Sequence, residues 1–259
     1  GREESGHDLL SARLSDPQSQ QELHYAYGLF LASLDQDQAA LASVSQIPPS
    51  ERSAGMNALL TRINTNITLR EVEQQNQTGE RAAAIERLQQ LEQNISSNDE
   101  QLLRVARAWS AMGEHQQALR LLETLITGDP EPPVALYLLK ADWRLAVNPQ
   151  QDLIPLIGLI GQQSFTDAEH ADFNDLTDRW LQLQMEQAIE HNRPTEAQSA
   201  IERYRLWQPE ADKSRYAQLQ LASLRQQWPE VAAGYQALIK QHPEVIDYRQ
   251  QLVDTLLKL

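Results

Sequence analysis

The sequence predicts an all-α fold: a right-handed superhelical solenoid built from repeated helix pairs. The 259-residue chain is rich in Ala, Leu, Gln and Glu, which lose little freedom in a helix, and it contains 10 glycines. A pattern of small, aromatic and apolar residues recurs every 34 residues, and this recurrence breaks at two places. Helix pairs that repeat at a fixed period stack into a solenoid, in which each unit contacts its neighbours.

The repeat is clearest at residues 99–132. Positions 8, 11, 15, 20 and 32 of this stretch are occupied by Ala106, Trp109, Gly113, Ala118 and Pro130. This spacing is typical of the tetratricopeptide (TPR) unit, which consists of two helices joined by a turn. The two alanines let the helices approach closely, the glycine allows a turn residue with positive φ, and the proline ends the second helix.

The same register extends along the chain in both directions. It places turn residues at Gly79 and Asn192 and small residues at Ala84 and Ala197, whereas Asp152 replaces the small residue of one degenerate unit. The predicted segments are, in order, the end of a truncated preceding repeat (1–20), a TPR unit (21–54), a helical insert or extension (55–64), three TPR units (65–166), a second insert or extension (167–177), two TPR units (178–245) and the first helix of a further truncated unit (246–259).

The two inserts, 55–64 and 167–177, break the 34-residue register but keep a helical pattern without an internal proline. We therefore predict that Ser50 to Asn76, and Thr166 to His191, each form one long helix or a helix pair. Thr166 and Glu169 have the spacing of a capping box, which predicts a helix start there. Because the inserts interrupt nearest-neighbour packing, both are candidate hinges or changes in superhelix curvature.

The net charge of −14 and the absence of cysteine exclude several classes of site. An acidic chain repels a phosphate backbone, so we predict no nucleic-acid partner, and the same charge disfavours anionic lipid headgroups. A neutral ligand such as a glycan stays possible. Without cysteine the chain has no disulfide, no thiolate zinc site and no cysteine nucleophile.

Motifs of catalysis are absent from the sequence. It has no glycine-rich phosphate loop, no nucleophile elbow and no His-Glu-x-x-His pair. The densest polar cluster, Asp167, Glu169, His170 and Asp172, has the residue types of a metal or acid–base site. Acidic residues are also favoured in the first turn of a helix by its dipole, and we prefer that interpretation. We predict no enzyme, no catalytic residue, no metal and no cofactor.

The first helices of stacked TPR units line the concave side of a solenoid, chiefly through positions 2, 5, 9, 12 and 13. The distinctive residues at these positions are our candidate groove residues: Tyr25, Arg107, Tyr137, Arg144, Arg179, Tyr216 and Gln220. They offer stacking faces and hydrogen-bond donors to an extended polar ligand. Trp109 and Trp143 occupy the packing position 11 and are predicted core residues, whereas Trp207 and Trp228 fit either packing or sugar stacking.

Residues 47–59 carry information beyond the repeat pattern. Their sequence, Ile-Pro-Pro-Ser-Glu-Arg-Ser-Ala-Gly-Met-Asn-Ala-Leu, resembles a segment of the periplasmic TPR region of bacterial cellulose synthase operon protein C. The resemblance extends loosely through Tyr137 and the second insert. It implies a periplasmic superhelix that precedes an outer-membrane barrel in the full-length protein, contacts subunits of the cellulose synthase complex and escorts β-1,4-glucan. It carries over no catalytic residue.

Two other functions compete with that of a scaffold for polysaccharide export. A peptide-binding adaptor would hold a carboxylate between Lys and Asn side chains on the concave helices, and no unit has that clamp at positions 5 and 9. A generic TPR interaction scaffold of another bacterial envelope assembly fits the sequence as well, and it stays open as the alternative.

Overall fold

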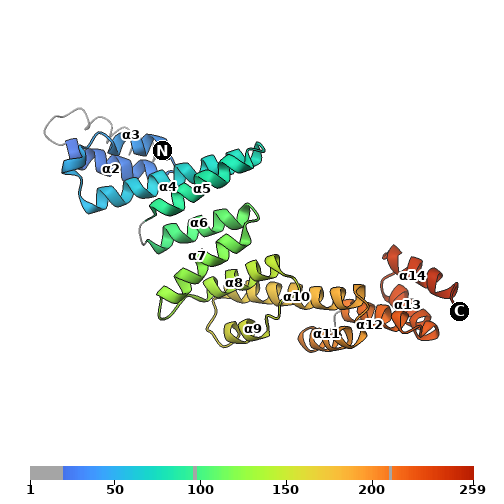
Figure 1. Cartoon of the computed structure of the whole chain (residues 1–259). Coiled ribbons are helices and arrows are strands. Elements are labelled where there is room, and N and C mark those ends of the chain that lie inside the picture. The colour runs from blue at the N-terminus through green and yellow to red at the C-terminus, as the bar shows by residue number, and fades with distance from the viewer. Residues whose placement is uncertain (1–19, 96–97, 210–211) are drawn as a thin grey trace. The chain divides into compact units, whose positions relative to one another are not determined.

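The computed structural model describes residues 20–95, 98–209 and 212–259 (Figure 1). Within these ranges the chain forms thirteen α-helices and one short 3-10 helix and no strand, which confirms the predicted all-α fold. The chain divides into two compact units, one ending at Gly128 and one beginning at Asp129, and each is described by itself. The predicted end of a preceding repeat, residues 1–20, lies outside the described residues except for Gln20.

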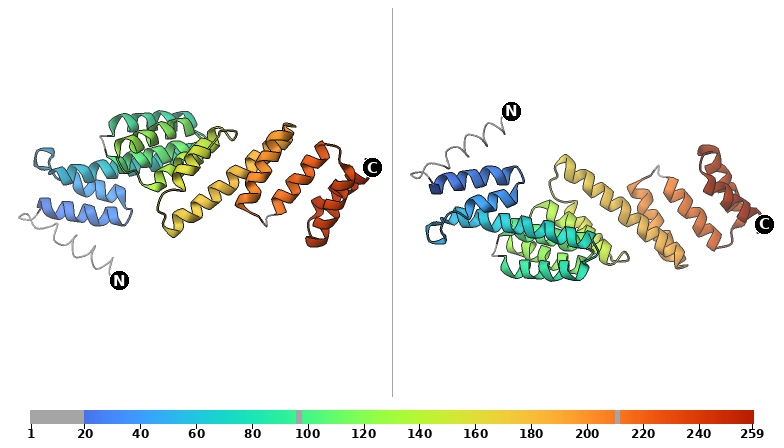
Figure 2. Two further views of the ribbon diagram at one scale, coloured as in Figure 1. Left: turned by 90° about the horizontal axis from the view of Figure 1, so that it is seen from below. Right: turned by 90° about the horizontal axis from the view of Figure 1, so that it is seen from above.

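The N-terminal unit consists of helix pairs in which successive helices pack side by side (Figure 2). Its elements are α2 (Gln20–Ser33), α3 (Asp37–Val44), η1 (Pro49–Glu51), α4 (Ala54–Gln77), α5 (Arg81–Asn94), α6 (Asp99–Ala111) and α7 (His115–Gly128). The pairs are α2 with α3, α4 with α5, and α6 with α7, and α4 also contacts the first helices of both flanking pairs.

The C-terminal unit repeats this arrangement. Its elements are α8 (Val134–Val147), α9 (Ile154–Ile160), α10 (Asp167–Glu190), α11 (Pro194–Trp207), α12 (Asp212–Leu224), α13 (Trp228–Gln241) and α14 (Ile246–Leu256). The long helix α10 contacts α8 on one side and α11 and α12 on the other. The first helices α8, α10 and α12 therefore follow one another in direct contact, as in a TPR array.

The turn inside each regular helix pair contains one residue with positive φ. The five such residues among the described ones are Asp35, Gly79, Gly113, Asn192 and Gln226, and all stand at position 15 of a predicted unit. Spacings of 34 residues separate Gly79 from Gly113 and Asn192 from Gln226, as the register predicts. The backbone thus repeats a left-handed turn at position 15 even where the residue is not glycine.

We expect opposite effects from two substitutions at this turn position. Gln226→Gly should raise the free energy of unfolding of the C-terminal unit by about 0.5 kcal/mol, because glycine adopts positive φ without the Cβ clash. Gly113→Ala should lower the free energy of unfolding of the N-terminal unit by about 1 kcal/mol, because alanine has a Cβ that clashes at positive φ. Urea unfolding of both variants tests this. A destabilised Gln226→Gly variant would contradict it.

Small or β-branched residues at position 20 stand fourth in the second helix of each regular pair and are fully buried. They are Ala40, Ala84, Ala118, Ala197 and Val231. Gly28, at position 8 of its unit, packs so closely that an added Cβ would lie 2.2 Å from Cγ2 of Val44. In the unit 212–245 the large residue is on the first helix and the glycine on the second. Leu219 stands at position 8, and a Cβ added to Gly234 would lie 2.2 Å from its side chain. Close helix contact therefore depends on one small residue per pair, on either helix.

Each insert is part of one continuous helix of 24 residues, α4 in the N-terminal unit and α10 in the C-terminal unit. Helix α4 starts after Ser53, whose hydroxyl accepts the N–H of Met56 at 3.2 Å, and not at Ser50, which lies in η1. The sequence signal misplaced this start because Arg52 is extended and separates the two helices. Helix α10 begins with the capping box of Thr166 and Glu169. Each insert is therefore part of one long helix and does not form a helix pair.

The degenerate unit at 133–166 keeps its first helix but has a second helix of seven residues, α9. Asn148 and Pro149 follow α8, and a residue before proline is disfavoured in the helical conformation. Asp152, which stands where the other units have a small residue, lies just before α9 and accepts the N–H of Ile154 at 2.9 Å.

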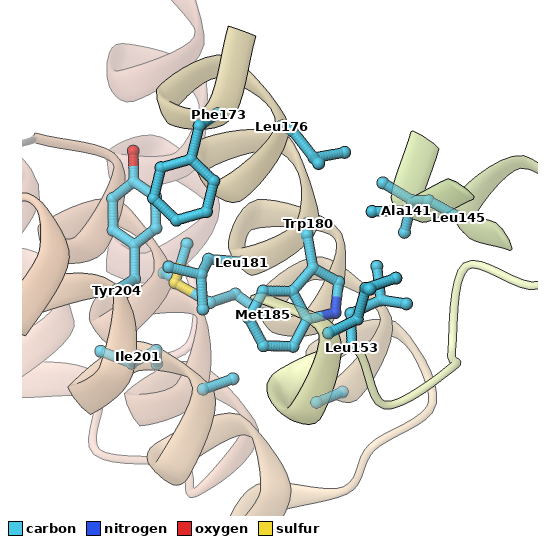
Figure 3. Packing of buried hydrophobic residues seen from close by; sticks show 14 of the residues in the cluster. Ala141, Leu145, Leu153, Phe173, Leu176, Trp180, Leu181, Met185, Ile201 and Tyr204 are labelled. Atoms are coloured by element: carbon cyan, nitrogen blue, oxygen red, sulfur yellow. The ribbon is translucent and has the colours of Figure 1, made fainter. Parts of the chain in front are cut away.

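The core of the C-terminal unit is organised around the second insert (Figure 3). Phe173, Leu176 and Trp180 project from α10 into a cluster with Leu153 and residues of α8 and α11. Trp109 and Trp143 are also buried, which confirms that they are core residues. Trp207 packs edge-on against Phe173, with ring centroids 6.1 Å apart, so it belongs to the same cluster.

Candidate functional site

Direct bonds join the first helices of neighbouring helix pairs. Arg104 on α6 donates to the Asn66 side chain on α4, and Arg179 on α10 donates to Asp142 on α8 at 2.8 Å. The Tyr216 hydroxyl on α12 donates to Asp247 on α14 at 2.9 Å. Two of the candidate groove residues, Arg179 and Tyr216, therefore tie adjacent first helices together.

Arg179 also contacts Asp175 at 3.1 Å, so two carboxylates neutralise its charge. The hydrogen bond that Arg179 donates to Asp142 raises the pKa of the guanidinium further above its ordinary value. Both partners are about half exposed, so this pair contributes little to stability. The two carboxylates occupy the Nε and one Nη of this guanidinium.

Tyr216 lies in an aromatic cluster with Tyr235 and Tyr248, whose ring centroids are 6.1 and 5.6 Å from its own. The pKa of the Tyr216 hydroxyl is raised above its ordinary value, mainly by burial and secondly by its hydrogen bond to Asp247. Burial raises the pKa of Tyr235 to about 12. These phenols are neutral at physiological pH, and Gln220, one turn further along α12, is half-buried.

The other candidate groove residues lie on three first helices. Tyr137 and Arg144 are half-buried on α8, where Tyr137 packs against the core of the C-terminal unit. Arg107 is exposed on α6, and Tyr25 is half-buried on α2. Within the N-terminal unit Tyr25 lines a pocket that does not include Arg107.

This pocket, here called the insert pocket, has a volume of about 220 Å³ and lies among α2, α4 and α6. Its lining residues are Tyr25, Leu29, Gly55, Ala58, Leu59, Arg62, Asn98, Glu100 and Gln101. The α4 residues among them fall in the first insert, at the spacing that places residues on one helix face. Tyr25 was a candidate from the sequence. Gly55, Arg62 and Gln101 were not, because the pocket requires that α4 pass between α2 and α6.

A second pocket, of about 250 Å³, lies where α10 ends and α11 begins. Its lining is polar and includes Gln184, Arg193 and Arg203. Gln184 donates to the carbonyl of Pro149 at 3.0 Å, and Arg193 pairs with Glu196 at 2.7 Å. The Nε atoms of Arg193 and Arg203 are buried without a hydrogen-bond partner among the described residues, and the lining has little apolar surface beside them.

No family model matches the chain. Cellulose synthase operon protein C of Pseudomonas fluorescens is 25% identical over 172 residues, which are 65% of this chain and 13% of that protein. Putative cellulose synthase operon protein C of Escherichia coli is 32% identical over 83 residues, 32% of this chain and 7% of that protein. The curated homologues of this chain are cellulose synthase operon protein C.

The resemblance seen in residues 47–59 to cellulose synthase operon protein C is thus confirmed, and the chain spans a small part of the length of these homologues. Among solved structures, a thermophilic TPR protein from Thermus thermophilus is 16% identical with a TM-score of 0.31. That match covers 74% of this chain and 99% of the other. No helix among the described residues is both long and apolar enough to cross a membrane.

The acidic cluster at the start of α10 is a helix cap. Glu169 accepts the backbone N–H of Thr166 at 2.9 Å and its hydroxyl at 2.7 Å. His170 contacts the side chain of Asn174 at 3.1 Å. In the described ranges no three His, Cys, Asp or Glu side chains lie close enough together to hold a metal ion.

The capping carboxylate predicts an acid-sensitive helix start. The hydrogen bonds from Thr166 hold the pKa of Glu169 below its ordinary 4.5. A lowered pKa in the folded state means that the ionised carboxylate stabilises the fold above pH 4.5, and this contribution is lost as pH falls through the folded value. Thermal unfolding followed against pH should show less acid loss in Glu169→Gln than in wild type. Equal loss in both would refute it.

Proposed function

We propose that the chain is a periplasmic, non-enzymatic TPR scaffold of a cellulose biosynthesis and export system. In this proposal it guides glucan and/or synthase subunits toward an outer-membrane pore. The similarity to cellulose synthase operon protein C over 172 residues is the observation that carries the proposal. In each unit the first helices supply the binding surface, α2, α4 and α6 in the N-terminal unit and α8, α10, α12 and α14 in the C-terminal unit.

The composition of that surface supports a neutral or weakly charged partner. The chain carries 36 acidic and 22 basic residues, so anionic polymers would be repelled over most of it. Several basic side chains on the first helices are paired internally, as Arg179 is with Asp142. Hydroxyl, amide and aromatic groups are left to make contacts, and they suit a polar uncharged chain.

The proposal is tested in a cellulose-producing bacterium that carries this chain. Removing the segment of the gene that encodes it should reduce extracellular cellulose to background, measured as glucose released by cellulase, while the synthase subunits stay present. Restoring the wild-type segment should restore the cellulose. Unchanged cellulose in the deletion strain would contradict the proposal and favour the generic scaffold of another envelope assembly.

A further inference from the structure

The insert pocket is a product of the first register break. Gly55, Ala58 and Arg62 project from the part of α4 that a regular 34-residue unit lacks. This part passes beside Leu29 of α2 and Gln101 of α6, so three first helices close around one concavity. A regular repeat has no residues at this place, and the insert therefore adds a site to the surface.

A buried hydrogen-bond acceptor in the pocket has no partner. Gln101 is 5% exposed, and its Oε1 atom forms no hydrogen bond within the described part of the chain. Leaving a buried polar atom unpaired costs about 1–3 kcal/mol. Because this atom is itself buried, an O–H or N–H group of a ligand in the pocket would remove the cost once the Gln101 amide turns its Oε1 toward the pocket. Gln101 is thus a specific reason for the pocket to be occupied.

Arg62 and Tyr25 provide the complementary donors. Neither side chain has a hydrogen-bond or ion-pair partner among the residues that the structure describes, and both are half-buried. The Tyr25 hydroxyl lies 3.1 Å from the point where a Cβ on Gly55 would be. The missing side chain at Gly55 therefore leaves the hydroxyl open to the pocket.

The rest of the pocket favours a neutral ligand with an apolar face. Leu29, Leu59 and Ala58 form its apolar wall, and the exposed fraction of Leu29 is 39%. Arg62 and Glu100 place one charge of each sign at the pocket, so a fully charged ligand would meet repulsion from one of them. A pyranose ring has an apolar face and a rim of hydroxyl groups that both donate and accept hydrogen bonds.

We propose that the insert pocket binds one pyranose residue of a β-1,4-linked glucan. Gln101 accepts from a ring hydroxyl, Arg62 and Tyr25 donate to others, and the apolar face lies against Leu29. This inference rests on the proposed function, because the cellulose system supplies the glucan. It adds to the proposed function that the first insert, and not a regular repeat, makes this contact with glucan.

The second insert provides a matched control. Helices α4 and α10 have the same length and each follows a capping Ser or Thr, so Ala168 and Asp175 stand at the helix positions of Gly55 and Arg62. Asp175 is paired with Arg179, and Ala168 is exposed. A bulky residue at Ala168 therefore changes an equivalent helix position without touching the insert pocket.

Isothermal titration of the whole chain with cellohexaose tests the proposal, with maltohexaose as the α-linked control. We expect weak binding of cellohexaose, with a Kd on the order of 1 mM or below, and weaker binding of maltohexaose. Gly55→Val, which fills the space over the Tyr25 hydroxyl, and Gln101→Leu, which removes the acceptor, should each weaken binding about tenfold or more. Ala168→Val should bind as wild type does. Gln101→Leu should not unfold the chain, because leucine is similar in size and removes an unpaired polar atom.

Three outcomes would overturn the proposal. They are no heat with cellohexaose at millimolar concentration, equal affinity in wild type and Gly55→Val, and equal affinity for maltohexaose. Loss of cellulose in the deletion strain together with any of these outcomes would leave the scaffold function intact and transfer its contacts to protein subunits. If cellulose were unchanged in that strain and cellohexaose still bound in the insert pocket, the scaffold function would fail and the glucan site would stand.

Discussion

Replacing Trp180 by alanine should lower the free energy of unfolding of the C-terminal unit by about 3 kcal/mol. Trp180 is 4% exposed and lies on α10 beside Leu153 and Met185, in the core that α10 shares with α8, α9 and α11 (Figure 3). Removal of a buried indole costs about 3–5 kcal/mol through lost burial and the cavity left behind. The lower end applies here because the Trp180 N–H has no partner among the described residues, and its removal relieves that cost.

Urea unfolding monitored by circular dichroism measures this change, and two controls define its origin. Trp180→Phe keeps most of the apolar surface and removes the unpaired N–H, so it should cost much less than Trp180→Ala. Trp228→Ala, at a half-buried site beside Lys258, should cost less still. A Trp180→Ala variant as stable as wild type would show that α10 does not hold this core together.

Gly28→Ala should lower the free energy of unfolding of the N-terminal unit by about 1–2 kcal/mol, although alanine favours helices. The added Cβ would lie 2.2 Å from Cγ2 of Val44, a β-branched side chain that cannot turn away freely. The helices α2 and α3 must separate to accept it. This is an overpacking effect, which typically outweighs the gain in helix propensity.

A double-mutant cycle tests the cause of this loss. Val44→Ala should be destabilising by itself, and combining it with Gly28→Ala should cost less than the sum of the two, because the clash is gone. Gly128→Ala, where an added Cβ meets no atom within 4 Å, is the control in the same unit and should be close to neutral. Additive effects of the first two substitutions would argue against close contact between α2 and α3.

The repeat itself could be predicted because each unit encodes its turn and its close contact locally. Gly79, Gly113 and Asn192 adopt positive φ where the register predicted a turn residue. Asp35 and Gln226 adopt it as well, and their residue types gave a weaker signal because tertiary packing of the flanking helices imposes the turn. The starts of α4 and α10 differed in predictability for a similar reason, since Thr166 with Glu169 is a recognisable capping box and Ser53 with Met56 is not.

The candidate groove residues were predicted from their positions in the 34-residue repeat. A repeat position does not reveal whether the side chain is already hydrogen-bonded to a neighbouring helix. Arg179 and Tyr216 stand on first helices as predicted, but each is engaged by an aspartate of a neighbouring first helix. The insert pocket could not be read from the 34-residue pattern, because Gly55 and Arg62 lie where that pattern is interrupted. Gln101, at position 3 of its unit, is distinguished by burial without a partner, which a sequence does not reveal.

We propose that the first helices of each unit form the binding face of a cellulose scaffold. Site-specific photo-crosslinking in cellulose-producing cells tests it most directly, with the crosslinking amino acid placed at Arg107 on α6 or at the exposed Gln117 on α7. We predict adducts with glucan or with a subunit of the cellulose synthase complex from position 107 and none from position 117. Equal adducts from both positions, or adducts with proteins unrelated to cellulose synthesis, would contradict the account.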